Sequence, residues 1–358
     1  MTRPETKPAR SLGDLVRAGL LPADRVAALD AVVDTLPVGV SADLLAATVP
    51  GDAADPIARQ FLPDLRELTI APEELADPIG DEVHAPVKGI VHRYPDRVLL
   101  KPLLTCPVYC RFCFRREAVG PGSDALTATE LAQALDYIRA RPEIWEVILT
   151  GGDPLMLSPR RLGQIVGALD AIPHVGVIRL HSRVPVADPK RITPALIASL
   201  RSRSAAIYLA VHCNHARELS PAALGACASL SAAGIPLLGQ SVLLRGVNDS
   251  VEALSALMRA LVRARIKPYY LHHGDLARGT GHFRTSIAEG QALMRALRGR
   301  LSGLAQPTYV LDLPGGHGKV PVGPSYVTET EGGSYLIEDP WGERHLYPPA
   351  APVAGPDR

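Results

Sequence analysis

Long apolar runs are missing from this chain of 358 residues. No stretch approaches the roughly 18 apolar residues that a membrane-spanning helix needs. The first 25 residues are charged and contain no continuous apolar segment of the secretory kind. Hydrophobic residues nevertheless make up 47% of the chain, which is enough to bury a large core. We therefore expect a protein with no membrane partner and no secretory leader, located in the cytoplasm.

An excess of one charge sign is also missing, because 38 lysines and arginines face 37 aspartates and glutamates. Proteins that bind nucleic acid or anionic membranes usually carry a strong positive field, so we expect neither as a partner. Cysteine is scarce, with five residues in all. An odd number with three clustered is a poor disulfide framework and favours metal ligation in a reducing compartment.

A spacing of 30 residues separates four short runs of aliphatic and β-branched residues, centred on Val147, Val177 and Ile207 and beginning again near Leu237. Such runs suit strands that are buried on both faces. Helix-like segments lie between them, and three open with Ser-Pro or Thr-Pro, an N-cap followed by proline at the first helical position. About thirty residues is the length of one βα unit, so we expect the strands to be parallel.

This 30-residue alternation of predicted strands and helices predicts an α/β fold, a full or partial parallel (βα) barrel over residues 86–320. No predicted strand leads into a G-x-G-x-x-G helix start, which argues against an open doubly wound sheet. Residues 1–85 are predicted as a helical N-terminal extension. Residues 321–358 are predicted as a small C-terminal β hairpin around a Gly-Gly turn, with a frayed tail. The predicted strands are 97–104, 145–150, 175–182, 206–212, 236–244, 267–273 and 308–314, and the predicted helices are 158–172, 193–203, 220–234, 250–266 and 286–301.

Cys106, Cys110 and Cys113 follow the first predicted strand with the spacing C-x3-C-x2-C. An iron–sulfur cubane has four irons, so three thiolates would leave one iron open. An open iron can take a molecule with an amine and a carboxylate, and S-adenosylmethionine is such a molecule. The spacing therefore predicts a [4Fe-4S] cluster with one open iron. A structural zinc site with Cys213 as fourth ligand, or three packing cysteines, are the alternatives.

Six segments of the chain together carry a resemblance to a known family: HRYPDRVLLKPLLTCPVYCRFCFRR, ILTGGDPLML, IRLHSRVPV, GQSVLLRGVND, GDLARGTGHFRT and PTYVLDLPGGHGKVPVGP. Taken together and in this order, they resemble the lysine 2,3-aminomutases among the radical S-adenosylmethionine enzymes, over about residues 84–326. The resemblance implies an isomerase that converts L-lysine to β-lysine by 2,3-amino migration, with a [4Fe-4S] cluster, S-adenosylmethionine and pyridoxal 5′-phosphate as cofactors. A shorter branch of the family makes (R)-β-lysine for elongation factor P, and membership of that branch stays open.

The resemblance assigns pyridoxal phosphate to a lysine in a glycine-rich segment. Lys319 matches the lysine that holds this cofactor through a Schiff base, and we expect the glycines before it to form a mobile loop. The segment is not a phosphate-binding P-loop, since Leu313 and Val320 occupy the positions that need glycine and Ser or Thr. Arg93 and Arg97 match basic residues near the cofactor's phosphate. Taken alone, these two arginines would also fit a solvated basic turn.

The resemblance also implies contacts to S-adenosylmethionine. Gly151, Gly152 and Asp153 match the motif that contacts its methionine part. His212 and Gln240 match further contacts to it. A single histidine at a strand end is often structural, which is the alternative for His212.

Substrate contacts are implied for three charged residues. Asp275 and Asp312 match the residues that bind the side-chain ammonium of the substrate. Two close carboxylates repel each other, and a bound cation relieves that repulsion, so they would select a substrate with a second positive charge. Arg115 matches the residue that pairs with the substrate carboxylate. The planar guanidinium of arginine suits this role because it can donate two parallel hydrogen bonds to one carboxylate. The adjacent His272 and His273 receive no role.

The expected partners are L-lysine, an electron donor such as flavodoxin or ferredoxin, and a second copy of the chain in a homo-oligomer. Some family members bind zinc through additional C-terminal cysteines. Since the last cysteine here is Cys227, we expect no such zinc site. Two rival hypotheses stay open: a radical enzyme for another amino acid such as glutamate, and a non-catalytic iron–sulfur or zinc protein.

Overall fold

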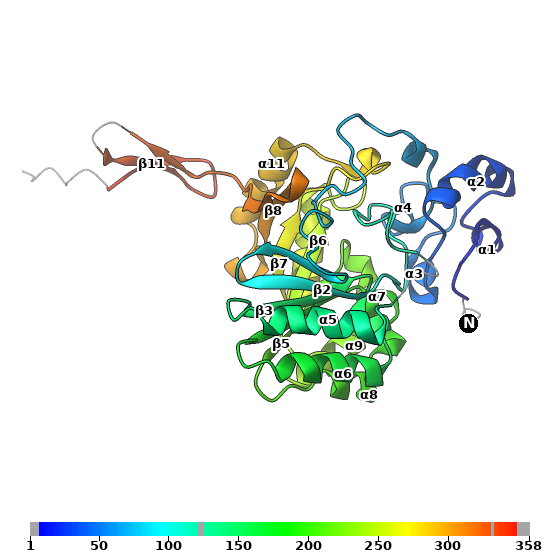
Figure 1. The fold of residues 1–358 in the computed structure, drawn as a ribbon. Coiled ribbons are helices and arrows are strands. Elements are labelled where there is room, and N and C mark those ends of the chain that lie inside the picture. The colour runs from blue at the N-terminus through cyan, green and yellow to red at the C-terminus, as the bar shows by residue number, and fades with distance from the viewer. Residues whose placement is uncertain (1–6, 121–124, 331–332, 349–358) are drawn as a thin grey trace, which may run out of the picture.

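The computed structural model describes residues 7–120, 125–330 and 333–348. A nine-stranded sheet dominates it, and its strands lie side by side in chain order from β1 to β9 (Figure 1). The neighbours from β2 to β8 are parallel, whereas β1 and β9 pair antiparallel at the two edges. No pairing joins β1 to β9 within the described residues, so the sheet is a partial barrel.

All seven predicted parallel strands are confirmed. A strand order that follows the chain without reversal separates this fold from a doubly wound sheet, whose order reverses at a switch point. The two antiparallel edge strands were not predicted. The strands are β1 (Ile90–Tyr94), β2 (Arg97–Leu103), β3 (Glu146–Gly151), β4 (Val177–Ser182), β5 (Ala206–His212), β6 (Leu237–Val242), β7 (Ile266–His272), β8 (Thr308–Leu313) and β9 (Gly318–Pro321).

Helices connect the parallel strands, and each of the five predicted helices is present. The predicted N-caps of the three Ser-Pro and Thr-Pro helices are confirmed. The side chains of Ser158, Thr193 and Ser220 each accept a hydrogen bond from a backbone N–H of the first turn. The sequence analysis missed the helix α5. The helices of this part are α5 (Ala128–Arg139), α6 (Pro159–Asp170), α7 (Val184–Ala187), α8 (Pro194–Ser199), α9 (Pro221–Ala232), α10 (Val251–Arg263) and α11 (Ile287–Arg298).

Short helices occupy the N-terminal segment, as predicted, and lie to one side of the barrel (Figure 1). Leu15, Leu29, Val32 and Phe61 are buried in a hydrophobic cluster of this segment, and Val108 from the cysteine-bearing loop joins the same cluster. The N-terminal segment is therefore packed against the loop that carries the three cysteines. Its helices are α1 (Leu12–Arg17), α2 (Val26–Thr35), α3 (Ala42–Ala47) and α4 (Ala58–Phe61).

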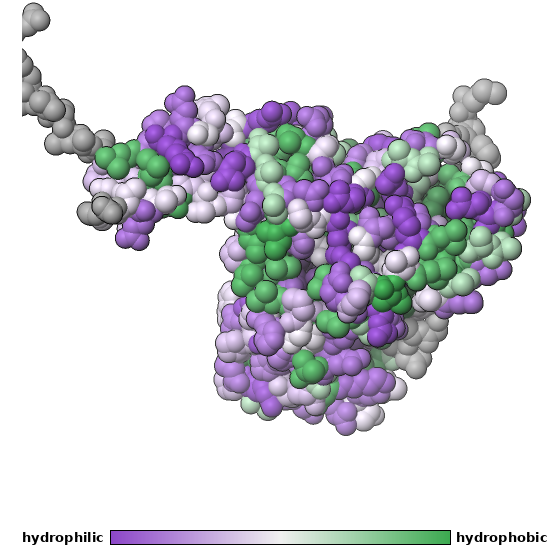
Figure 2. All heavy atoms as spheres, turned by 90° about the horizontal axis from the view of Figure 1, so that it is seen from above, coloured by the Kyte–Doolittle hydropathy of each residue, from purple (hydrophilic) through white to green (hydrophobic). Residues whose placement is uncertain are grey.

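A small antiparallel sheet of β10 (Val327–Glu329), β11 (Tyr335–Glu338) and β12 (Arg344–Tyr347) stands off the body (Figures 1 and 2). The predicted hairpin is its β10–β11 pair, and the third strand was missed. Residues 331–332 of the Gly-Gly turn and residues 349–358 of the predicted frayed tail lie outside the described residues. Within the described residues, no helix is both long and apolar enough to cross a membrane.

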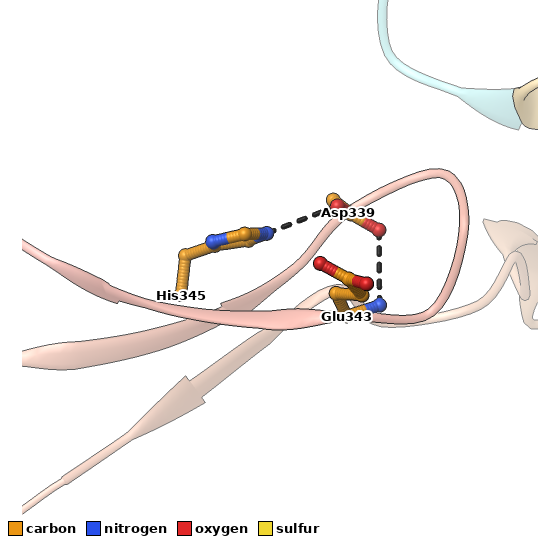
Figure 3. Close-up of side chains that lie close together, drawn as sticks. All are labelled: Asp339, Glu343 and His345. Atoms are coloured by element: carbon orange, nitrogen blue, oxygen red, sulfur yellow. Dashed lines mark hydrogen bonds and ion pairs between the residues drawn. The ribbon is translucent and has the colours of Figure 1, made fainter.

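The turn between β11 and β12 brings Asp339, Glu343 and His345 together (Figure 3). Asp339 accepts hydrogen bonds from the backbone N–H groups of Trp341 and Glu343, and its other oxygen lies 2.9 Å from Nε2 of His345. These bonds close a tight turn, which accounts for the proximity of the three side chains.

Candidate functional site

A cavity of about 610 Å³ lies inside the partial barrel. It extends from the first residues of β2 and β8, Arg97 and Thr308, to the loops that follow the carboxyl ends of the parallel strands. Its volume lies within the range of small-molecule sites. Every residue that the sequence analysis assigned to a site lines this cavity. These residues are Arg93, Arg97, Cys106, Cys110, Cys113, Arg115, Gly151, Gly152, Asp153, His212, Gln240, Asp275, Asp312 and Lys319.

The loop after β2 presents Cys106, Cys110 and Cys113 to the cavity. Burial raises the pKa of all three thiols, that of Cys113 to about 12. Iron would therefore be needed to keep them ionised.

Cys213 does not complete a four-cysteine site. Its side chain is buried at the end of β5, outside the cavity lining, and its Sγ donates to the carbonyl of His215 at 3.4 Å. Cys227 is buried within α9. Among the described residues, only three cysteines therefore reach the cavity, which fits a cluster with one open iron.

A buried acid of the N-terminal segment holds the cysteine loop in place. Glu67 accepts hydrogen bonds from Arg111 at 2.6 Å and from Arg116 at 2.5 Å, and all three side chains are buried. Arg111 also donates to the carbonyl of Leu36 at 2.7 Å. The sequence analysis missed Glu67, because nothing in the sequence connects an acid to arginines more than forty residues away.

The Gly-Gly-Asp motif after β3 packs against the same loop. A Cβ at Gly152 would lie 2.4 Å from the carbonyl oxygen of Thr105, so only glycine fits there. The buried carboxylate of Asp153 accepts hydrogen bonds from Ser182 Oγ and from the backbone N–H of Arg183. The motif thus joins the cysteine loop to the ends of β3 and β4.

Six buried polar atoms of residues that line the cavity have no hydrogen-bond partner in the protein: Nε2 of His181, Nε2 of His212, Oδ1 of Asp275, and Nε of Arg93, Arg179 and Arg183. Buried polar atoms in proteins are nearly always paired with protein, water or a ligand, so the two histidines and Asp275 offer free polar atoms to whatever fills the cavity. His212 and Asp275 were predicted as ligand contacts. His181 was missed, although its position at the end of a predicted strand could have marked it.

Lys319 lies on β9, directly opposite Asp312 of β8 in the antiparallel pair. Its ammonium group forms an ion pair with Asp312 and lies 3.2 Å from Nδ1 of His272. Its backbone N–H donates to the hydroxyl of Tyr94 at 2.6 Å, and the guanidinium of Arg97 stacks 3.8 Å above the ring of that tyrosine. Lys319 and Arg97 are thus connected through one tyrosine.

The expected glycine-rich loop is only a tight turn, and Lys319 lies beyond it on a strand. Residues Pro314–Gly316 form a single tight turn between β8 and β9. The carbonyl of Gly316 is hydrogen-bonded to Nε2 of His84 at 3.1 Å, and a Cβ at Gly80 would lie only 2.7 Å from the nitrogen of Gly316. Contacts from residues 80–84 therefore fix this turn, and Lys319 is presented by a strand.

His272 connects two groups of predicted site residues. Its Nε2 lies 3.0 Å from Nε2 of Gln240, and its Nδ1 lies 3.3 Å from Oδ2 of Asp312. Burial and the positive charge of Lys319 lower the pKa of His272, so its ring is neutral at neutral pH. A neutral ring can donate through Nδ1 to Asp312 and accept from Gln240 at Nε2.

The two predicted substrate acids differ in protonation. Burial and the negative charge of Asp312 raise the pKa of Asp275 to about 7. Burial would also raise the pKa of Asp312, but the hydrogen bond from His272 and the charge of Lys319 hold it well below its usual range. A cation bound beside Asp275 would favour its ionised form, as expected for an ammonium site.

Asp81 forms ion pairs with three cations, two of which, Arg93 and Arg115, line the cavity. Its carboxylate lies 2.7 Å from Arg115, 3.4 Å from Lys101 and 3.5 Å from Arg93. Burial would raise the pKa of Asp81, but these three charges lower it. No sequence motif marked Asp81 as a site residue. Two arginines that were predicted to bind anions are therefore oriented by one acid of the N-terminal segment.

A loop with three cysteines at the mouth of a parallel partial barrel defines the class of radical S-adenosylmethionine enzymes. The family model "Radical SAM superfamily" matches residues 100–258, and the model "Lysine-2,3-aminomutase" matches residues 294–334. The solved structure of a radical SAM methyltransferase from Sphaerobacter thermophilus aligns with a TM-score of 0.46 and 20% identity over 62% of this chain and 68% of that chain.

Similar proteins of known name identify the family within this class. An L-lysine 2,3-aminomutase of Clostridium subterminale is 42% identical over 82% of this chain and 71% of its own length. A putative L-lysine 2,3-aminomutase of Aquifex aeolicus is 39% identical over 86% of this chain and 83% of its own length. A glutamate 2,3-aminomutase of Clostridioides difficile is 38% identical over 82% of this chain and 68% of its own length. The chain belongs to the lysine 2,3-aminomutase family and is an enzyme of the isomerase kind, and this family implies a [4Fe-4S] cluster and S-adenosylmethionine.

Proposed function

We propose that this chain converts L-lysine to β-lysine by 2,3-amino migration, with pyridoxal 5′-phosphate bound to Lys319. The observation that carries the proposal is the position of Asp275 and Asp312 in one cavity with Lys319. A substrate with a second ammonium group would neutralise two carboxylates there. Glutamate would bring a third carboxylate to the same place, and the repulsion would disfavour it.

The fit of pyridoxal phosphate rests on this chain's own side chains. Lys319 supplies a half-buried amine, and Arg93 and Arg97 supply positive charge in the same cavity. When bound, this cofactor supplies a conjugated system that can stabilise an unpaired electron on the substrate. The protein's part is to hold the substrate, to orient it and to exclude water.

Each end of lysine has a matching group in the cavity wall. Arg115 offers a guanidinium to the α-carboxylate, and Asp81 fixes its orientation through a bond of 2.7 Å. Asp275 and Asp312 offer carboxylates to the side-chain ammonium. Lys319 already forms an ion pair with Asp312, and the neutral His272 is hydrogen-bonded to the same carboxylate, so Asp275 is the acid with an unpartnered oxygen for an incoming cation.

The test is an anaerobic assay of the full chain. The protein is reconstituted with iron and sulfide and then given S-adenosylmethionine, pyridoxal phosphate, dithionite as reductant and either L-lysine or L-glutamate. We expect β-lysine from lysine and no product from glutamate. Formation of β-glutamate in place of β-lysine would contradict the proposal, and so would the absence of both products from protein with a complete cluster. Chiral chromatography of the product then separates the (R) form, expected for the elongation factor P branch, from the (S) form.

A further inference from the structure

Arg183 is a buried cation that directly contacts a cysteine of the loop. It follows β4, and its Nη1 donates to Sγ of Cys110 at 3.0 Å. The residue is only 5% exposed. Hydrogen bonds and positive charge near cluster sulfurs stabilise the more negative, reduced cluster, because reduction adds one electron to it.

Several contacts fix the guanidinium in this position. Its Nη2 donates to Gln60 Oε1 at 2.7 Å and to Glu218 Oε2 at 2.6 Å, and its Cζ lies 4.6 Å from the ring centre of Phe61. The backbone N–H of Arg183 donates to Asp153 at 2.7 Å, which holds its Cα at the end of β4. The charge therefore cannot swing away from Cys110 without breaking this network.

The anchoring residues are themselves fixed. Glu218 is buried and accepts backbone N–H bonds from Asn214 and His215, both at 2.9 Å. Gln60 lies on α4 of the N-terminal segment, and its backbone carbonyl accepts from the N–H of Arg111, the residue after Cys110. The same network therefore positions both the cation and the loop that carries the thiol.

We propose that Arg183 is a positioning residue that raises the reduction potential of the cluster through its hydrogen bond to Cys110. Glu218 offsets part of this effect, since its carboxylate is the partner of the same guanidinium. The result is a cluster that accepts one electron more readily from its donor. This inference concerns the cluster alone and holds whether lysine or another amino acid is the substrate.

The test is a potentiometric titration of the full-length, reconstituted protein, with dithionite as reductant and the EPR signal of the reduced cluster as readout. Arg183→Gln removes the charge and should give about tenfold less reduced cluster at a fixed potential, which corresponds to a midpoint about 59 mV lower. Arg183→Lys keeps a positive charge and should fall between Arg183→Gln and the wild type. The matched control is Arg217→Gln, which breaks an ion pair with Asp55 next to Glu218 without touching a cysteine. Its midpoint should equal that of the wild type.

A second variant, Glu218→Gln, tests the proposal even if the Arg183→Gln protein fails to bind a complete cluster. It removes the negative partner of Arg183 and should move the midpoint upward, opposite to Arg183→Gln. A purely structural role predicts loss of cluster content in both variants with no shift of opposite sign. An unchanged midpoint in Arg183→Gln with full cluster content would overturn the proposal, and so would the absence of an upward shift in Glu218→Gln.

Discussion

Lys319 and Asp312 are paired residues of the β8–β9 hairpin, and their side chains form an ion pair inside the cavity. The pairing holds the side chain of Lys319 beside Asp312, and His272 is hydrogen-bonded to the same carboxylate. If Lys319 binds pyridoxal phosphate as proposed, Asp312 loses this partner, and the second ammonium group of the substrate can replace it.

The first prediction concerns Lys319→Ala. We expect this variant to lose the visible absorbance of protein-bound pyridoxal phosphate and to keep the absorbance of the iron–sulfur cluster, because Lys319 does not touch the cysteines. Lys190→Ala, a change at an exposed lysine outside the cavity, is the control and should keep both bands. Retention of the cofactor band in Lys319→Ala would show that another lysine holds it.

The second prediction concerns substrate binding by Asp275→Asn. Loss of a charge-assisted hydrogen bond should raise KM for lysine roughly 10- to 100-fold, with a smaller effect on kcat. Steady-state assays at saturating cofactors measure this. Asp339→Asn, in the turn of the C-terminal sheet, is the matched control and should leave KM unchanged. Equal KM values for Asp275→Asn and wild type would remove Asp275 from the ammonium site.

The third prediction is a pH dependence of stability. A pKa of about 7 for Asp275 means that the folded state holds this proton more tightly than the unfolded state, whose pKa is near 3.8. Its contribution to stability is therefore present at low pH and is lost as the pH rises through about 7. Asparagine is neutral throughout, so Asp275→Asn should gain about 1–3 kcal/mol relative to wild type between about pH 5 and about pH 8. Thermal unfolding of both proteins without ligands measures this difference, and a pH-independent difference would contradict it.

The fourth prediction concerns Glu67. Glu67→Gln leaves Arg111 and Arg116 buried without their counter-charge, so the free energy of unfolding should fall by about 3–5 kcal/mol. Asp136→Asn breaks an exposed ion pair with Arg139 and should change it by no more than about 0.5 kcal/mol. Denaturant unfolding of both variants measures the difference. Similar values for the two variants would mean that the buried network contributes little to stability.

The regular part of the fold could be predicted from local signals. Parallel strands buried on both faces are continuous apolar runs, and the Ser-Pro and Thr-Pro caps mark the helix starts at Ser158, Thr193 and Ser220. The edge strand β9 was missed because its sequence, GKVP, is short, begins with a glycine and follows two more, Gly315 and Gly316. Strand pairing with β8, rather than local preference, gives it its structure.

The predicted site residues share one cavity because strand ends of a parallel barrel converge, and the motifs marked those ends. Asp81, Glu67 and Arg183 act through partners that are distant in sequence, such as Cys110 and Arg115. Ion pairs between buried residues that are distant in sequence form only when the chain has folded. No local sequence pattern therefore predicts which acid pairs with which arginine. These three residues also explain why the N-terminal segment is part of the site.

The most direct test of the central claim follows the migrating nitrogen. L-lysine labelled with ¹⁵N at its α-amino group is given to the reconstituted enzyme, and the product is examined by NMR. We predict that β-lysine carries the label on C3, with none released as ammonia. An unlabelled C3 amine, or label recovered as free ammonium, would contradict an intramolecular 2,3-migration in this cavity.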